Sequence, residues 1–522
     1  MKLIESLQNK TLYNHAVKNF DVIETHISWV ILTGQYVYKI KKPVNFGFLD
    51  FSSLENRRFF CSEEIRLNRR LAPQLYLEVV TICGSATQPN LEGKGPAIEY
   101  AVKMRQFPQS AQLDRLLSAK GLERSMVDTL ASKVANFHLS IEFSSEESPF
   151  GDLEHIRQPI LDNFHQIRAC KLDASIESTL IKLEQWSLQQ LKEMADVFRQ
   201  RKAKGFIREC HGDMHLRNIA WWQGEIIIFD CIEFNKSFFW IDTISDIAFL
   251  IMDLEDRRAH ALAVHFLNVY LEITGDFAGV TLLRFYKVYR ALVRAKVNAL
   301  RAAQERIGTP QYDETYLDVI QYLQLADSYI RPASPCLLIN HGLSGSGKSY
   351  ISGKILEKFA AIRIRSDIER KRLFQASQNE NAHDAIDAGI YTADATRQTY
   401  QQLVKIAKIL LTAGYPVIVD AANLKQQQRQ LFTDLAKSLQ IPFMIIDYHA
   451  SEVTLRQRIK KRAQQQDDVS DATLAVLEQQ LKERELLIGA EQPFVIQIAS
   501  DAAIEIDAIV DKIRAQLNRY RT

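Results

Sequence analysis

The chain has 522 residues, which is too long for one ordinary hydrophobic core and suggests about two to four domains. Its hydrophobic fraction of 47% and charged fraction of 25% are typical of a folded protein and exclude disorder on the scale of the whole chain. The net charge is only +2 with Lys and Arg scattered, so composition gives no strong argument for a nucleic-acid or membrane partner.

Targeting segments are not expected. Residues 1–6 are charged too early to begin a signal peptide, and the longest apolar block, residues 247–252, is far shorter than a membrane span. The six cysteines form no CxxC pair, as is usual for reduced thiols. Together these features predict a cytoplasmic protein.

The first third of the chain is predicted to be a small mixed lobe. Residues from about 20 to 110 carry several strand-like pieces and one strong helix, from about 55 to 71. Side chains alternate along a strand, so Lys39 and Lys41 share one face of the predicted strand that contains them. Glu64, in the helix that follows, is a natural ion-pair partner for one of the two lysines.

A larger helical lobe is predicted next. Residues about 111–200 and 244–330 show mainly helical patterns, and a short strand-rich section, 207–232, lies between them.

The strand-rich section holds a constellation suited to phosphoryl transfer. In the run HGDMHLRN, Asp213 stands five residues before Asn218, the spacing used in the protein-kinase fold. In that chemistry the Asp meets the incoming hydroxyl while the Asn binds Mg²⁺. A predicted strand then ends at Asp230, which would hold the metal. Each element alone is weak, but the ordered set of Lys, Glu, Asp-x₄-Asn and strand-Asp predicts a phosphotransferase site.

These motifs, together with the run DTISDIA at 242–248, resemble the aminoglycoside phosphotransferase family and its choline-kinase-like relatives over about residues 20–300. The resemblance implies a bilobal α+β, protein-kinase-like domain over residues 1–330. Its small lobe would span about 20–105 and its helical lobe about 106–330.

The same resemblance assigns Lys39 and Glu64 to the nucleotide site. Lys41 stays open as the alternative lysine, because strand parity cannot separate the two. Only Gly34, and no GxGxxG loop, precedes the lysines, and Asp230-Cys231-Ile232 stands where protein kinases carry DFG.

A linker is predicted at residues 331–335, RPASP, whose two prolines follow a helical stretch and precede a strand. After it, strand candidates alternate with helical patterns, for example at 392–413 and 470–488, so residues 336–522 should form a parallel sheet covered by helices. The strand candidates are 336–341, 361–365, 416–420, 442–447 and 494–498.

Residues 342–349, GLSGSGKS, match the P-loop pattern GxxxxGK[ST], which predicts an ATP- or GTP-binding domain of the P-loop NTPase class. The loop follows a predicted strand and opens a predicted helix at 348–359, as the mechanism requires. Glycines let backbone N–H groups turn inward around phosphates. The predicted nucleotide contacts are Gly342, Ser344, Gly345, Ser346, Gly347, Lys348 and Ser349, and the Ser349 hydroxyl can also coordinate Mg²⁺.

Two carboxylates follow later predicted strands. Ligands of such sheets bind beyond the carboxyl ends of the strands, so Asp367 and Asp420 should both point into the cleft, where either could accept a proton from a substrate hydroxyl or hold Mg²⁺. A helix-capping role is the alternative for each. Arg458 and Arg462 lie four apart on one helical face and could close over the transferring phosphate, although a solvated face explains them as well.

The P-loop, the Ser366-Asp367 pair with Arg370 and Arg372, and the run VDAAN at 419–423 resemble the small P-loop kinases. That group includes gluconate kinases, polynucleotide 5′-kinases and zeta-toxin-like kinases. The resemblance implies Asp367 as the general base, with Arg458 and Arg462 in the lid. The acceptor does not carry over, because this fold group phosphorylates many compounds.

The sequence as a whole resembles a bacterial fusion of these two kinase types. The leading hypothesis is an enzyme with two kinase domains, each transferring a γ-phosphoryl group from a Mg²⁺-nucleotide to a hydroxyl of a small molecule. One alternative is a nucleotide-binding regulatory protein, although a pure binder has no need of Asp213. The other, a nucleic-acid end kinase, is disfavoured by the low net charge.

Overall fold

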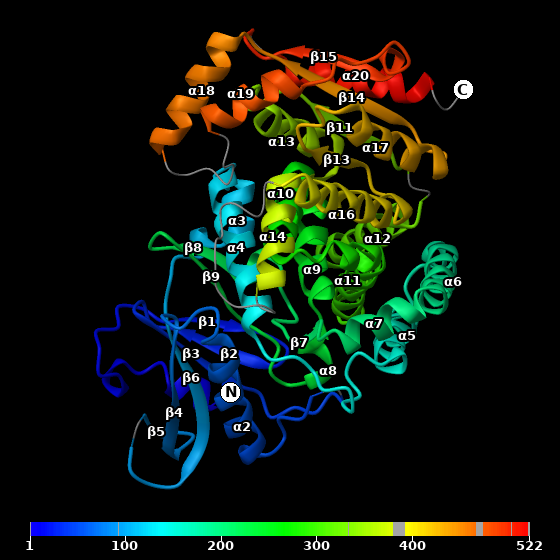
Figure 1. The fold of residues 1–522 in the computed structure, drawn as a ribbon. Coiled ribbons are helices and arrows are strands. Elements are labelled where there is room, and N and C mark those ends of the chain that lie inside the picture. Colours follow the sequence, from blue (N-terminus) through cyan, green and yellow to red (C-terminus); the bar gives the residue numbers. More distant parts are fainter. Residues whose placement is uncertain are drawn as a thin grey trace. The chain divides into compact units, whose positions relative to one another are not determined.

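The computed structural model describes residues 2–47, 49–91, 93–331, 334–378, 392–465, 473–502 and 504–519. The chain divides into two compact units. The colours of Figure 1 follow the sequence, so the reader can trace the residues of each unit there. Unit 1 comprises Met1–Arg257 and Leu283–Ile330, and unit 2 comprises Arg258–Leu282 and Arg331–Thr522. Residues 258–282 thus group with the C-terminal unit, which differs from the division at the 331–335 linker expected from the sequence.

Unit 1 begins with α1 (Lys2–Ser6) and an antiparallel six-stranded sheet of order β1-β2-β3-β6-β4-β5. The strands are β1 (Asp21–Glu24), β2 (Ser28–Leu32), β3 (Tyr36–Lys41), β4 (Tyr76–Ser85), β5 (Gln88–Leu91) and β6 (Ala97–Arg105). Tyr38 and Ile40 of β3 pack into an apolar cluster on one face of the sheet. Because side chains alternate, Lys39 and Lys41 face the other way. That other face is covered by α2 (Leu54–Asn68), which packs against β4 and β6.

Helices form most of the rest of unit 1. They are α3 (Leu113–Ser118), α4 (Arg124–Ser140), α5 (Leu153–Ala169), α6 (Glu177–Glu193), α7 (Ala195–Ala203), α8 (Lys236–Phe239), α9 (Thr243–Asp256), α11 (Val280–Ala302) and α12 (Pro310–Tyr329). Two antiparallel ribbons lie among them, β7 (Ile207–Glu209) with β10 (Trp240–Asp242) and β8 (Ile219–Trp222) with β9 (Glu225–Ile228). A small mixed lobe followed by a helical lobe, with a strand-rich section inside it, is confirmed.

Unit 2 contains a parallel five-stranded sheet of order β12-β13-β11-β14-β15 (Figure 1). The strands are β11 (Leu337–His341), β12 (Ile362–Arg365), β13 (Val417–Asp420), β14 (Phe443–His449) and β15 (Val495–Ala499). The helices after the linker are α13 (Lys348–Phe359), α14 (Ser366–Gln378), α16 (Ala393–Thr412), α17 (Gln426–Ser438), α18 (Glu452–Gln465), α19 (Leu474–Glu483) and α20 (Ile506–Arg519). All five predicted strands and the α/β class are confirmed.

Helix α10 (His260–Thr274) completes unit 2 at the edge strand of this sheet. The buried Asn268 side chain donates from Nδ2 to Ala361 O at 3.0 Å, and its Oδ1 accepts from Arg363 N at 2.7 Å. Glu272 accepts from Arg363 Nη2 at 2.7 Å. The side chain of Asn268 therefore satisfies the backbone groups that the edge strand β12 would otherwise leave unpaired.

Replacing Asn268 by Ala is expected to destabilise unit 2 by about 1–3 kcal/mol. The change leaves the Arg363 N–H of β12 and the Ala361 C=O just before it without their hydrogen-bond partner. Urea unfolding of the full chain, followed by hydrogen exchange of unit 2 amides, measures the change. Asn518→Ala is the matched control, since Asn518 is an exposed residue of α20. Equal unfolding of the two variants would show that α10 is not part of the folded unit.

Among the described residues, no helix combines the length and the apolar character needed to cross a lipid bilayer.

Candidate functional site

A cavity of about 630 Å³ in unit 1 brings together three of the sequence-predicted residues of the N-terminal constellation. Its walls come from the sheet, from residues 104–107 at the end of β6, from the segments at 212–213 and 229–234, and from helices α5 and α11. Lys39, Asp213 and Asp230 all line it, although they are far apart in the sequence.

Lys39 is held at the cavity by two carboxylates. Its Nζ lies 2.9 Å from Glu64 Oε1 and 2.5 Å from Asp230 Oδ1. Burial alone would lower the pKa of Lys39, but the charges of Asp230 and Glu64 raise it well above its usual value. Burial conversely raises the pKa of Glu64, and Lys39 and Lys41 outweigh it and bring that pKa down to about 2. Both shifts favour the charged pair.

Lys41 occupies a different position on the same face of β3. It is fully buried, pairs with Glu64 Oε2 at 2.7 Å and also contacts Glu233. Glu64 therefore pairs with both lysines, whereas the sequence predicted one. Only Lys39 of the two lines the cavity and contacts Asp230, so the geometry favours Lys39 as the phosphate-facing lysine.

Asp213 and Asn218 are joined in the loop that follows β7. Asn218 Nδ2 donates to Asp213 Oδ2 at 2.9 Å and to Asp213 O at 3.1 Å, which fixes the two side chains relative to each other. Burial would raise the pKa of Asp213, but the His215 ring, 3.4 Å from Oδ2, lowers it well below its usual value. Asp213 is therefore an ionised acceptor over the whole physiological pH range.

Asp246, in the first turn of α9, holds this loop in place through hydrogen bonds to its backbone. Its buried carboxylate accepts from His211 N at 3.0 Å and Gly212 N at 2.9 Å, and it lies 3.1 Å from His138 Nε2. Arg290 holds the other side of the loop by donating to Gly212 O at 2.9 Å. The backbone just before Asp213 is thus held by Asp246 at its N–H groups and by Arg290 at the Gly212 carbonyl.

Replacing Asp246 by Asn is expected to lower the free energy of unfolding by about 1–3 kcal/mol, because an amide cannot accept all of these hydrogen bonds. Burial raises the pKa of Asp246, but its hydrogen bond and charge interaction with His138 bring it down to about 2. This stabilisation is present in full above the unfolded pKa of about 4 and is lost as the pH falls through about 2.

Urea unfolding at pH 7 and at stepwise lower pH measures that difference. Asp256→Asn, on the same helix α9, is the control, and its effect should be smaller because Asp256 is only partly buried and bonds to the side chains of Gln321 and Tyr322, not to backbone N–H groups. A difference between wild type and Asp246→Asn that grew on acidification would contradict the role assigned to the carboxylate.

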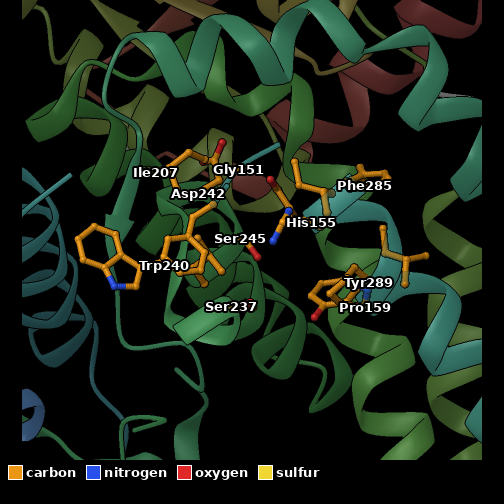
Figure 2. A pocket seen from close by; sticks show the side chains of 15 residues that line it. Gly151, His155, Pro159, Ile207, Ser237, Trp240, Asp242, Ser245, Phe285 and Tyr289 are labelled. Carbon is orange, nitrogen blue, oxygen red and sulfur yellow. The ribbon is translucent and has the colours of Figure 1, made fainter. Parts of the chain in front are cut away.

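A second, smaller cavity of about 50 Å³ lies between α5, α11 and β10 (Figure 2). It is mostly aromatic and aliphatic, with Phe150 stacked on Trp240 at a ring-centroid distance of 6.0 Å. Pro159 and Tyr289 line both cavities. At this volume it holds no more than a very small group, so the large cavity is the candidate site.

In unit 2, the P-loop connects β11 to α13 as predicted. Gly345 has φ +83°, and a Cβ added there would lie 2.9 Å from Leu455 O. Gly342 has φ +144°, and its added Cβ would lie 2.7 Å from Tyr448 O. Only glycine fits these two backbone positions, which explains their place in the motif. Lys348 Nζ donates to Leu343 O at 2.8 Å and so lies over the loop.

Polar side chains gather where β11 and β13 end. Asn340 Nδ2 donates to Asp420 Oδ1 at 2.9 Å, and the Tyr448 hydroxyl donates to Asn340 Oδ1 at 3.2 Å. Within the described residues, Asp420 Oδ2 and Ser346 Oγ are buried without a hydrogen-bond partner. Burying an oxygen atom without a hydrogen-bond partner costs free energy. These two atoms therefore indicate a binding site for a ligand or ion.

Asp367 lies in the first turn of α14. Its Oδ2 accepts from Arg365 Nη2 at 3.0 Å, and its Oδ1 accepts from Ile368 N at 3.0 Å. The second contact is a helix-start hydrogen bond, so part of the alternative capping role is present. Burial lowers the pKa of Arg365, but the carboxylates of Asp367, Glu272 and Asp420 raise it above its usual value. Arg365 thus links Asp367 electrostatically to Asp420.

Arg458 of α18 contacts the P-loop directly. Its Nη1 donates to Gly345 O at 3.2 Å and to Ser500 Oγ at 3.0 Å. Arg462 is on the same helix, and its side chain lies outside the described residues.

Sequence reasoning missed two residues of these sites. Asn340 could have been suspected, because it is a polar residue in the otherwise apolar run CLLIN before the P-loop. Glu233 carries no such signal, because its partner Lys41 is 192 residues away in the chain.

Comparison with known proteins agrees with the two-part architecture. Residues 337–487, which include the P-loop, match the family model described as an AAA domain. An uncharacterized protein of Mycobacterium tuberculosis is 29% identical over 458 residues, which cover 88% of this chain and 89% of that protein.

Two solved structures are similar to different parts of the chain. A gluconokinase from Sinorhizobium meliloti is 21% identical, with 36% of this chain and 94% of that chain covered and a TM-score of 0.26. A putative aminoglycoside phosphotransferase from Ralstonia eutropha is 12% identical, with 63% of this chain and 97% of that chain covered and a TM-score of 0.36. The chain therefore joins a bilobal α+β unit to a C-terminal P-loop domain, of which residues 337–487 match the AAA domain family.

Proposed function

We propose that the protein is an ATP-dependent phosphotransferase with two kinase-type sites, each of which transfers a γ-phosphoryl group to a hydroxyl of a small molecule. One observation carries the proposal. Lys39, paired with Glu64 and Asp230, faces the same 630 Å³ cavity as Asp213, which is bonded to Asn218. Such a set holds phosphate charge at one end and an ionised proton acceptor at the other.

In unit 1 the charge of each site residue determines the role that we assign to it. Lys39 would pair with nucleotide phosphates, and its own pairing to Glu64 keeps it extended into the cavity. Asp213 would accept the hydroxyl proton and orient the oxygen for in-line attack. The amide of Asn218 and the carboxylate of Asp230 are oxygen donors of the kind Mg²⁺ prefers, so we assign them as its ligands. A bound Mg²⁺ would offset the charge of the phosphates during transfer.

In unit 2 the backbone N–H groups of residues 342–349 would surround the β-phosphate, and Lys348 would turn from Leu343 O towards the phosphates. Asp420, with its unsatisfied Oδ2, and the Ser349 hydroxyl fit a Mg²⁺ shell of oxygen ligands. Asp367 is assigned as the proton acceptor. Arg458 would stabilise the transferring phosphoryl group, with Arg462 as its proposed partner in the lid.

A screen with γ-labelled ATP over hydroxyl-bearing metabolites tests the proposal, with wild type, Asp213→Ala and Lys348→Ala side by side. We expect each variant to lose transfer to a different acceptor. If both variants retained every wild-type activity, the two-site assignment would be wrong. Nucleotide binding without any transfer would instead favour a regulatory protein, and transfer to nucleic-acid ends would favour the end-kinase alternative.

A further inference from the structure

Helix α11 presents a row of side chains to the large cavity of unit 1, on the side where Asp213 lies. The row, here called the acceptor wall, consists of Tyr289, Val293, Lys296, Val297 and Leu300. Successive members are four, three, one and three residues apart, which places them along one broad helical face. Across from the wall, α5 contributes Pro159, Asp162 and Gln166. An acceptor whose hydroxyl reaches Asp213 would lie between these two helices.

Lys296 is the unusual member of the acceptor wall. It is half-buried, yet within the described part of unit 1 its ammonium makes no hydrogen bond and no ion pair within 4 Å. Burial lowers the pKa of Lys296, and the charge of Asp162 recovers only part of that shift. A half-buried cation without a close partner is destabilised until a counter-charge reaches it.

The other charged groups near Asp213 are already engaged. The Arg290 guanidinium donates to Gly212 O, Ser245 O and Ser245 Oγ. Asp162 accepts from Gln158 Nε2 at 2.8 Å on its own helix, and it does not approach Lys296 to ion-pair distance. Asp213 itself is held by Asn218 and His215. Arg294, which also interacts with the charge of Asp213, is bonded to Tyr322. Among the described residues beside Asp213, Lys296 is thus a cavity-lining cation with its hydrogen-bonding capacity unused.

We propose that Lys296 binds an anionic group of the acceptor, and that the unit 1 acceptor is a hydroxylated carboxylate or phosphate compound. This inference rests on the proposed function of unit 1. The apolar neighbours Val293, Val297 and Leu300 line the same wall, and a bound acceptor would cover the exposed side chains of Val297 and Leu300 and so reduce the water around the pair. In the transfer, the acceptor oxygen bonds to the γ-phosphorus, the bond from γ-phosphorus to the bridging oxygen breaks, and ADP leaves with that electron pair. The hydroxyl proton passes to Asp213.

The helix also sets the size of the acceptor. Arg290, which fixes the loop beside Asp213, is six residues before Lys296, an axial rise of about 9 Å. The reactive hydroxyl and the anionic group should therefore be separated by several bonds and not share one carbon. A compound of the length of pantothenate or gluconate fits this separation better than glycerate.

The test compares anionic acceptors with neutral compounds that carry an alcohol in place of the carboxylate. The pairs are pantothenate with pantothenyl alcohol and gluconate with sorbitol. Transfer from γ-labelled ATP is measured in the full chain carrying Lys348→Ala, so that the unit 2 site does not contribute. We expect transfer to an anionic member in preference to its neutral partner.

Lys296→Met should then raise KM for the anionic acceptor by about 10- to 100-fold while kcat changes little. It should not lower the thermal unfolding temperature, because it removes no hydrogen bond or ion pair of the described residues. Lys296→Arg should restore most of the affinity. Asp162→Asn is the matched control, since an internal Lys296–Asp162 pair would make it behave like Lys296→Met, whereas an anion site predicts no rise in KM.

Preference for neutral acceptors, failure of every anionic member, or an unchanged KM in Lys296→Met would each overturn the anion site. A different result would contradict the proposed function of unit 1 itself. In that case neither the anionic nor the neutral compounds are phosphorylated, and Asp213→Asn leaves ATP consumption unchanged.

Discussion

Asp213→Asn is expected to lower phosphoryl transfer at the unit 1 site by about 10³-fold while the affinity for Mg²⁺-ATP stays nearly unchanged. The amide has almost the same size and can still bond to Asn218, so the loop should keep its shape. What it loses is the ionised oxygen that accepts the hydroxyl proton. The effect should appear in kcat, because that interaction is made only as the proton moves.

Initial rates with an accepted substrate, and titration calorimetry with ATP, measure the two quantities separately. Asp196→Asn is the control, because Asp196 is an exposed residue of α7 with one surface ion pair. Because His215 holds the pKa of Asp213 well below its usual value, protonation of Asp213 cannot account for a loss of activity between pH 7 and pH 5. Full activity of Asp213→Asn would remove the general-base role.

In unit 2, the sequence predicted the elements whose position depends on interactions between neighbouring residues. Short apolar runs flanked by turn residues located all five strands to within about two residues. The signal is strongest for β11, β13 and β14, because strands buried on both faces read as continuous apolar runs. The P-loop glycines fixed the start of α13 at Lys348, since their backbone conformations exclude other residues. Both signals are contained within a few neighbouring residues.

Contacts between residues far apart in the sequence could not be predicted from such local patterns. Lys39 and Lys41 have the same strand parity, and they differ only in that Lys39 meets Asp230, 191 residues later. Helix α10 is similar: its sequence predicts a helix, but nothing local indicates that Asn268 bonds to β12, 93 residues later. The assignment of 258–282 to unit 2 depends on that contact and could not come from composition or linker chemistry.

Lys348→Ala is expected to weaken ATP binding at the P-loop by about 10- to 100-fold and to lower transfer by a further factor of about 10²–10³. The ammonium is the mobile positive charge of the loop, while the backbone N–H groups supply the rest of the phosphate contacts. In the absence of nucleotide Lys348 donates to Leu343 O, a hydrogen bond that is easily exchanged for phosphate. The loss should therefore fall on the ligand and leave the stability of unit 2 little changed.

Titration calorimetry of the full chain with ATP, in an Asp213→Asn background with and without Lys348→Ala, measures nucleotide binding at the two sites. Lys358→Ala is the control, because Lys358 is an exposed residue at the other end of α13. If the sites act independently, Lys348→Ala leaves the unit 1 affinity unchanged within about 0.5 kcal/mol, as expected of distant substitutions. A reciprocal change of about 1–3 kcal/mol would instead show that nucleotide at one site biases the other, and the regulatory alternative would then explain the chain better than two separate enzymes.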